Sequence, residues 1–159
     1  MRIVILFLLF SFCAHSQNPN FKVEDGLINW NYVYEDSTSV SELKNKQLLE
    51  FKTDTTGYIK KTNFNNKHLR FFVAEFKIES KKNKYRVSVF NIVFDSDNFT
   101  MSSGGLSLGS NPTYTIETAF LKKDGTIKKT GSFGYNITET LNPHFVDLFT
   151  IKKKLKSEW

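Results

Sequence analysis

Cysteine is almost absent from this chain. The one cysteine among the 159 residues is Cys13, close to the N-terminus. Disulfide bonds, thiolate-based zinc sites and cysteine nucleophiles are therefore excluded from everything that follows it. The fold must be stabilised by its core alone, and the 16 phenylalanines supply much of that core.

Groupings of catalytic or metal-binding residues are also scarce. Only His68 and His144 follow the N-terminal segment, far apart and without neighbouring ligands at metal-site spacing. The stretch Gly131-Ser-Phe-Gly134 does not match the spacing of a serine-hydrolase elbow, and the glycines at 104–109 lack the Gly-Lys-Ser/Thr of a phosphate loop. Asp95 and Asp97 form the one compact carboxylate pair, and a turn explains them better than a site. We expect no catalytic residues, no metal and no cofactor.

The chain has one long apolar run, at its start. Arg2 is followed by eight apolar residues and then by small residues at Ala14 and Ser16, the pattern of a secretory signal peptide. The run is shorter than the ~20 residues of a spanning helix. We expect cleavage after Ser16, which leaves one domain at 17–159 without a transmembrane segment. The product would be periplasmic, on the cell surface or secreted. Lipidation at Cys13 is disfavoured by the bulky Phe12 before it.

The formal net charge is +6, from 22 basic and 16 acidic residues, and loss of Arg2 would make it +5. Such a balance can indicate nucleic-acid binding. Here the charges are scattered, and export would take the protein away from the genome. We expect no nucleic-acid partner, and at most weak attraction to anionic cell-surface polymers.

The stretch Leu69–Phe94 is predicted to form a long antiparallel hairpin around a turn at Lys81–Lys84. Both arms are rich in β-branched and aromatic residues that alternate with a period of two. If paired residue numbers sum to 165, one face is apolar, and Glu79 faces Arg86 on the other. The apolar face would pair Ile78 with Val87, Phe76 with Val89, Ala74 with Asn91 and Phe72 with Val93.

The second face of this hairpin is predicted to be polar near the turn and apolar far from it. On the same register, Val73 would lie beside Ile92 and Phe71 beside Phe94, with Phe90 next to them. A loop or another strand could cover these residues. Left open, they would form a binding or self-association surface, because soluble monomers seldom expose large apolar patches.

The remaining chain alternates between strand and helix patterns. We expect α+β architecture, with a curved antiparallel sheet of about five to six strands and two helices packed on one face. Besides the hairpin, the predicted elements are strands at Leu27–Tyr34, Tyr58–Phe64 and Tyr114–Leu121, a helix at Ser39–Glu50, and a terminal helix that starts at Asn142-Pro143 and buries Phe145, Leu148 and Phe149.

The chain resembles the exported Bacteroidetes domains of unknown function that are assigned a TATA-binding-protein-like fold. The resemblance covers about residues 22 to 156. It implies a fold but no activity and no site residues. It is carried by the export signal, Gly26-Leu-Ile-Asn-Trp30, Glu42-Leu43, Lys84-Tyr85-Arg86-Val87, Asn91-Ile92 and Pro143-His-Phe145. Asp36-Ser37-Thr38 and Asp54-Thr55-Thr56 also look similar to the O-glycosylation sequence of exported Bacteroidetes proteins.

Two functions are compatible with these patterns, and the sequence favours the first. One is a non-catalytic exported module that binds a protein, a surface glycan or a second copy through its sheet face, with Phe71, Val73, Phe90, Ile92 and Phe94 as the binding residues. The alternative is a carboxylate-based hydrolase of the cell envelope, which requires two acids in a concave pocket, at least one with a strongly shifted pKa.

Overall fold

The structure is a computed structural model that describes residues 20–35, 40–63, 71–95, 113–130 and 136–152. The expected signal peptide lies outside these ranges. Among the described residues no helix is long and apolar enough to cross a membrane.

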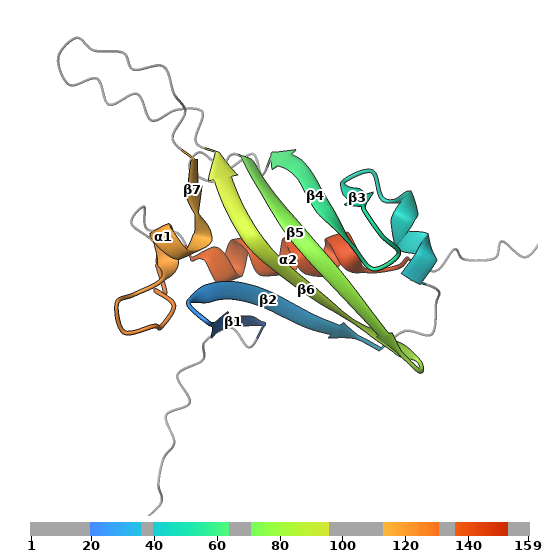
Figure 1. The fold of residues 1–159 in the computed structure, drawn as a ribbon, viewed down its shortest axis with the longest axis horizontal. Coiled ribbons are helices and arrows are strands. Elements are labelled where there is room, and N and C mark those ends of the chain that lie inside the picture. Colours follow the sequence, from blue (N-terminus) through green and yellow to red (C-terminus); the bar gives the residue numbers. More distant parts are fainter. Residues whose placement is uncertain (1–19, 36–39, 64–70, 96–112, 131–135, 153–159) are drawn as a thin grey trace, which may run out of the picture.

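Seven antiparallel strands form one sheet in the order β1-β2-β6-β5-β4-β3, with β7 paired to β6 (Figure 1). The hairpin β5–β6 occupies the centre, as predicted. The strands are β1 (Phe21–Glu24), β2 (Leu27–Tyr34), β3 (Leu49–Phe51), β4 (Thr56–Asn63), β5 (Phe71–Lys81), β6 (Lys84–Asp95) and β7 (Thr113–Thr115).

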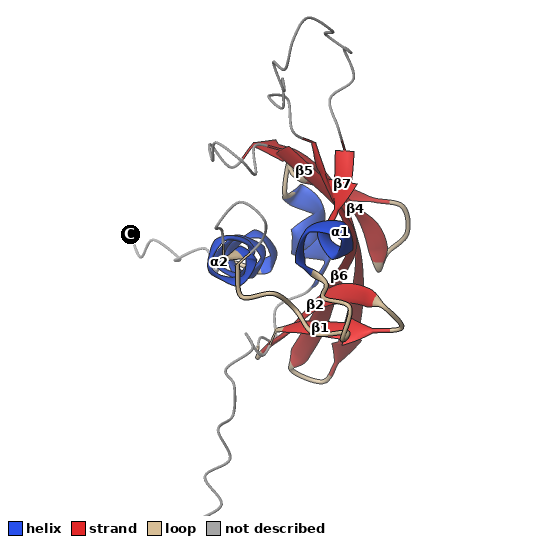
Figure 2. Ribbon diagram, turned by 90° about the vertical axis from the view of Figure 1, so that its left-hand side faces the viewer, coloured by secondary structure: helices blue, strands red, loops and turns tan. Residues whose placement is uncertain are grey.

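The described helices lie on one side of this sheet. They are the 3-10 helix η1 (Val40–Asn45), the short helix α1 (Ile116–Phe120) and the terminal helix α2 (Ile137–Phe149). Figure 2 shows α2 beside the curved sheet, and in Figure 1 the strands lie in front of it. The α+β class, the curved antiparallel sheet and the one-sided helices are therefore confirmed. The opposite face carries no helix among the described residues, and we call it the outer face.

Polar bonds fix α2 on the sheet in addition to its buried stripe of Leu141, Phe145, Leu148 and Phe149. Near the middle of the helix, the Oδ1 of Asn142 accepts hydrogen bonds from the indole of Trp30 at 2.9 Å and from the amide of Asn20 at 2.7 Å. At its end, the hydroxyl of Tyr85 donates to the carbonyl of Phe149 at 2.7 Å, and that of Tyr34 donates to Val146 at 3.1 Å. These tyrosines satisfy carbonyl groups that a helix C-terminus leaves without intrahelical partners.

A β-bulge interrupts the central hairpin. Near the turn the register is the predicted one, with Glu79 opposite Arg86 and Phe76 opposite Val89. Between Val73 and Glu75 the pairing shifts, so that Phe72 faces Phe94 instead of Val93. Asn91 lies in this segment with a φ of 51°. An extra residue in one strand reverses which side its later side chains face, and the predicted pairing of Ala74 with Asn91 is therefore wrong.

Three predicted elements are wrong in detail. The expected helix Ser39–Glu50 is the short η1 followed by β3, because Leu49 and Phe51 pair with β4. The expected strand Tyr114–Leu121 becomes helix after Thr115, whose hydroxyl caps the backbone N–H of Thr118.

The terminal helix starts at Ile137, before the predicted Asn142-Pro143 cap. Pro143 therefore lies inside the helix, and the side chain of Asn142 bonds to Trp30 instead of capping the helix.

Candidate functional site

The five residues predicted to form a binding surface do not share one face. Ile92 and Phe94 are 0% and 1% exposed, because the bulge turns them toward the helices. Phe71, Val73 and Phe90 remain on the outer face; Val73 is 42% exposed, and the other two are half-buried. The Nζ of Lys61 lies 4.6 Å from the centre of the Phe71 ring. The predicted pairs Val73–Ile92 and Phe71–Phe94 are therefore wrong. Val93 lies opposite Val73 instead, and the patch does not have the predicted five members.

The outer face instead carries a polar groove nearer the hairpin turn. Its volume is about 620 Å³, within the range of ligand-binding clefts. It crosses four neighbouring strands, because β1, β2, β6 and β5 follow one another in the sheet. The lining residues are Asn20, Lys22, Glu24, Asn31, Tyr32, Val33, Lys77, Glu79, Arg86 and Ser88.

An ion-pair cluster occupies one end of this groove. Arg86 donates from both Nε and Nη2 to the Oε2 of Glu79, with the Nε bond at 2.8 Å. Lys77 lies 3.3 Å from the other carboxylate oxygen. These two cations hold the pKa of Glu79 below its usual range, mainly through the hydrogen bonds from Arg86. Glu79 is therefore charged near neutral pH and already engaged by two cations.

The middle of the groove is organised by a cross-strand amide. Ser88 on β6 faces Asn31 on β2, and its hydroxyl donates to the Oδ1 of Asn31 at 2.6 Å. The Nδ2 end of the same amide makes no hydrogen bond within the described chain. Asn31 thus presents donors to the groove, while its acceptor is occupied.

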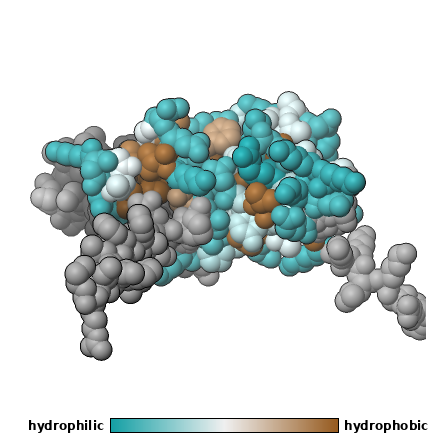
Figure 3. Space-filling model, turned by 90° about the horizontal axis from the view of Figure 1, so that it is seen from below, coloured by the Kyte–Doolittle hydropathy of each residue, from teal (hydrophilic) through white to brown (hydrophobic). Residues whose placement is uncertain are grey.

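The far end of the groove lies on β1. Lys22 makes no ion pair or hydrogen bond with its side chain among the described residues. Glu24 accepts one long hydrogen bond, 3.5 Å, from Asn29. Val33 is the most exposed apolar side chain of the lining, at 46%. Viewed from below (Figure 3), the described surface is mostly hydrophilic with separate apolar areas. The residues that line the groove are mainly polar or charged, so the groove suits a polar ligand.

The carboxylates with shifted pKa values do not support acid catalysis. Asp54, Glu79 and Asp124 all have a pKa below the usual range, chiefly because side-chain donors bond the ionised form. A general acid needs the opposite direction. No group of three or more possible metal ligands exists among the described residues. The candidate pair Asp95 and Asp97 extends beyond the described ranges, as does His68.

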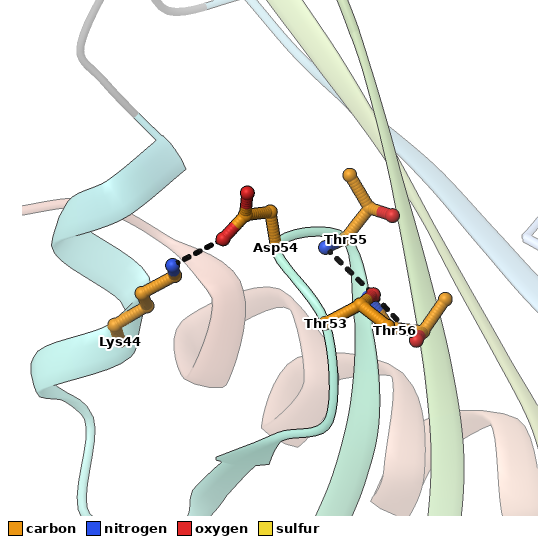
Figure 4. Close-up of polar contacts among 5 residues, drawn as sticks. All are labelled: Lys44, Thr53, Asp54, Thr55 and Thr56. Atoms are coloured by element: carbon orange, nitrogen blue, oxygen red, sulfur yellow. Dashed lines mark hydrogen bonds and ion pairs between the residues drawn. The ribbon is translucent and has the colours of Figure 1, made fainter.

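The turn between β3 and β4 contains the Asp54-Thr55-Thr56 sequence (Figure 4). The Oγ1 of Thr53 accepts hydrogen bonds from the backbone N–H groups of Thr55 at 3.2 Å and Thr56 at 3.0 Å. Asp54 forms an ion pair with Lys44 at 2.7 Å. Thr55 is exposed on this ordered turn, and the O-glycosylation resemblance stays a prediction.

One serine pattern was missed by the sequence reasoning. Gly105-Leu-Ser107-Leu-Gly109 has the Gly-x-Ser-x-Gly spacing of a nucleophile elbow. It lies outside the described residues. Asn111-Pro112 follows after one further residue, Ser110, and the residue before a proline is disfavoured in a helix. The sequence around Ser107 therefore does not favour the strand–turn–helix setting of an elbow.

Comparison with known proteins finds two similar solved structures. No family model and no curated protein matches the chain. A TBP-like protein from Parabacteroides distasonis has 17% sequence identity and a TM-score of 0.44, over 80% of this chain and 94% of the other. A DUF4468 family protein from Bacteroides ovatus has 11% identity and a TM-score of 0.48, over 85% and 93% of the two chains. Both organisms are Bacteroidetes, in agreement with the predicted resemblance, and neither likeness assigns an activity to this chain.

Proposed function

We propose that this chain is an exported, non-catalytic module that binds a polar partner in the outer-face groove. The observation that carries the proposal is that side chains from neighbouring strands meet in this groove and are held in place by hydrogen bonds to one another. Ser88 holds Asn31, and Glu79 holds Arg86. Groups held in place before binding lose less entropy when a ligand arrives.

The export signal, the absence of a recognisable catalytic set in the sequence and the downward pKa shifts of the carboxylates support binding over hydrolysis. A protein, a surface glycan or a second copy of the chain would each be a polar partner. The direct test is sedimentation of the mature protein, residues 17–159, with the insoluble cell-envelope fraction of a Bacteroidetes bacterium.

Ser88→Tyr places a ring on the groove floor and should abolish sedimentation. Lys60→Tyr places the same ring at an exposed position of β4, outside the groove, and should leave sedimentation unchanged. Solution mass, measured in parallel, detects binding of a second copy. Equal sedimentation of both variants, or none by the unchanged protein together with a monomeric mass, would contradict the proposal.

A further inference from the structure

The polar groups of the groove that remain unengaged are mainly donors. Lys22 has no side-chain partner, Asn31 has its Nδ2 left, and Arg86 has its Nη1 left, in each case within the described chain. Both oxygens of the Glu79 carboxylate are occupied by Arg86 and Lys77. The remaining carboxylate, Glu24, lies at the β1 end. A ligand rich in acceptors complements this lining.

These three donors lie along a diagonal of the sheet. Lys22 pairs with Asn29, Asn31 is two residues further along β2, and Arg86 pairs with Val33, two residues further again. Strands are about 4.8 Å apart and rise about 3.4 Å per residue, so the backbone positions of Lys22 and Arg86 are separated by about 17 Å. One small anion cannot reach both ends, whereas an extended polymer can.

The charge of the lining has the sign that such a polymer requires. Lys22, Lys77 and Arg86 are cationic, and Glu24 and Glu79 are anionic, so three positive charges face two negative ones. Lys77, Glu79 and Arg86 together keep one positive charge, and Lys22 and Glu24 balance each other, so the lining as a whole has a net charge of +1.

We propose that the ligand of this groove is an acidic polysaccharide, bound in an extended form through its carboxylates by Lys22, Asn31 and Arg86. This inference rests on the proposed function of the groove and specifies the chemical class of its ligand. Arg86 holds a carboxylate at one end, Lys22 holds a second one at the other end, and the Asn31 amide donates to hydroxyl or ring oxygens between them.

A matched pair of probes separates the charge of the ligand from its sugar backbone. Oligogalacturonate carries one carboxylate per sugar, and its methyl ester has the same backbone without the charge. Calorimetric titration of the mature protein should show binding of the free acid, at least about tenfold weaker binding of the ester, and a steep loss of affinity with added salt.

Two charge-removing variants test the residues. Lys22→Gln and Arg86→Gln should each weaken binding of the acid about three- to tenfold. Lys123→Gln removes the same charge from the exposed turn after α1, outside the groove, and should change it less than about twofold. Thermal unfolding of each variant checks that the fold is retained.

Each alternative outcome overturns the acidic-polysaccharide inference, and some leave the proposed function standing. Equal binding of acid and ester through the groove would leave a binding module for neutral polar ligands. If neither probe binds but sedimentation with envelopes still depends on the groove, the groove binds a ligand of a different chemical class. Equal or tighter binding of single-stranded DNA through Lys22 and Arg86 would indicate a nucleic-acid ligand. If neither probe binds and sedimentation does not depend on the groove, both proposals fail.

Discussion

The indole Nε1 of Trp30 donates a hydrogen bond of 2.9 Å to the side-chain oxygen of Asn142, across a sequence separation of 112 residues. Trp30 is fully buried on the helix side of β2. The same oxygen also accepts from the Asn20 amide at 2.7 Å. One amide oxygen thus ties α2 both to β2 and to the residue that precedes β1.

Replacement of Asn142 by leucine should destabilise the fold by about 1–3 kcal/mol, because the indole N–H of Trp30 would stay buried without an acceptor. Urea unfolding followed by tryptophan fluorescence measures this loss. Trp30→Phe removes the donor as well, so the double variant should lose less than the sum of the two single losses. Strict additivity would contradict a coupling through this bond.

The bulge at Asn91 makes a second prediction possible. With a φ of 51°, this residue has a conformation that asparagine and glycine tolerate and β-branched residues do not. Asn91→Gly should change the stability little, whereas Asn91→Val should cost about 1–2 kcal/mol. Denaturant midpoints of the two variants check this contrast. Equal midpoints would show that backbone strain is not what selects asparagine at this position.

Deletion of Asn91 should be far more damaging than either substitution. Without the extra residue, Ile92 and Phe94 would turn to the outer face, and two fully buried side chains would leave the core. We expect no cooperative unfolding transition and loss of the native circular dichroism spectrum. A folded deletion variant would mean that the register does not depend on the bulge.

The sequence predicted β2 and the turn half of the central hairpin well, because strict alternation and a polar turn specify the register there. Glu79 and Arg86 face each other as expected. Beyond Phe90 the residues are almost all apolar, Phe90-Asn-Ile-Val-Phe94. In a run of apolar residues, the pattern does not reveal where a bulge moves the following side chains to the other face of the sheet. For this reason the sequence predicted the apolar surface in the wrong place.

The groove could not be predicted as a unit. The polar character of the outer face near the turn was visible from Lys77, Glu79, Arg86 and Ser88. The contribution of Lys22 depends on β1 pairing with β2, and the predicted elements include no strand in this segment. The short η1 and α1 were misread because their apolar residues fit more than one period, and tertiary pairing and a threonine cap decided between them.

The two tyrosines at the end of α2 should differ in importance. Tyr85→Phe removes the donor to the buried carbonyl of Phe149 and should cost about 1–3 kcal/mol. Tyr34→Phe should cost less, because the carbonyl of Val146 keeps a 2.6 Å hydrogen bond from the Thr150 hydroxyl. Unfolding free energies of the two variants give the comparison directly, and a larger loss for Tyr34→Phe would contradict this assignment.

Gly57 on β4 should not accept any side chain. A Cβ at this position would lie 2.1 Å from the backbone oxygen of Glu50 and 2.7 Å from the Phe76 ring. Gly57→Ala should therefore force β3 away from β4 and cost about 3 kcal/mol or more. Gly26→Ala is the control, since its Cβ would meet no atom within 4 Å and only the φ of 77° opposes it. A smaller loss for Gly57→Ala than for Gly26→Ala would contradict the steric argument.

His144 on α2 should make the stability depend on pH. Burial lowers its pKa from the ordinary 6.5, with a smaller opposite effect of Asp147. As the pH falls through this ordinary value, the unfolded chain takes up a proton before the folded protein does. The unfolding free energy therefore decreases as the pH falls below 6.5, and the full contribution of His144 is present above that pH.

His144→Gln should flatten the decline in unfolding free energy between about pH 7.5 and about pH 5.5. His68→Gln removes the other histidine that follows the expected signal peptide and serves as the comparison. Urea unfolding at the two pH values measures the slope for each protein. If His144→Gln leaves the change in unfolding free energy with pH unaltered and His68→Gln abolishes it, the pH dependence comes from His68, and the prediction is wrong.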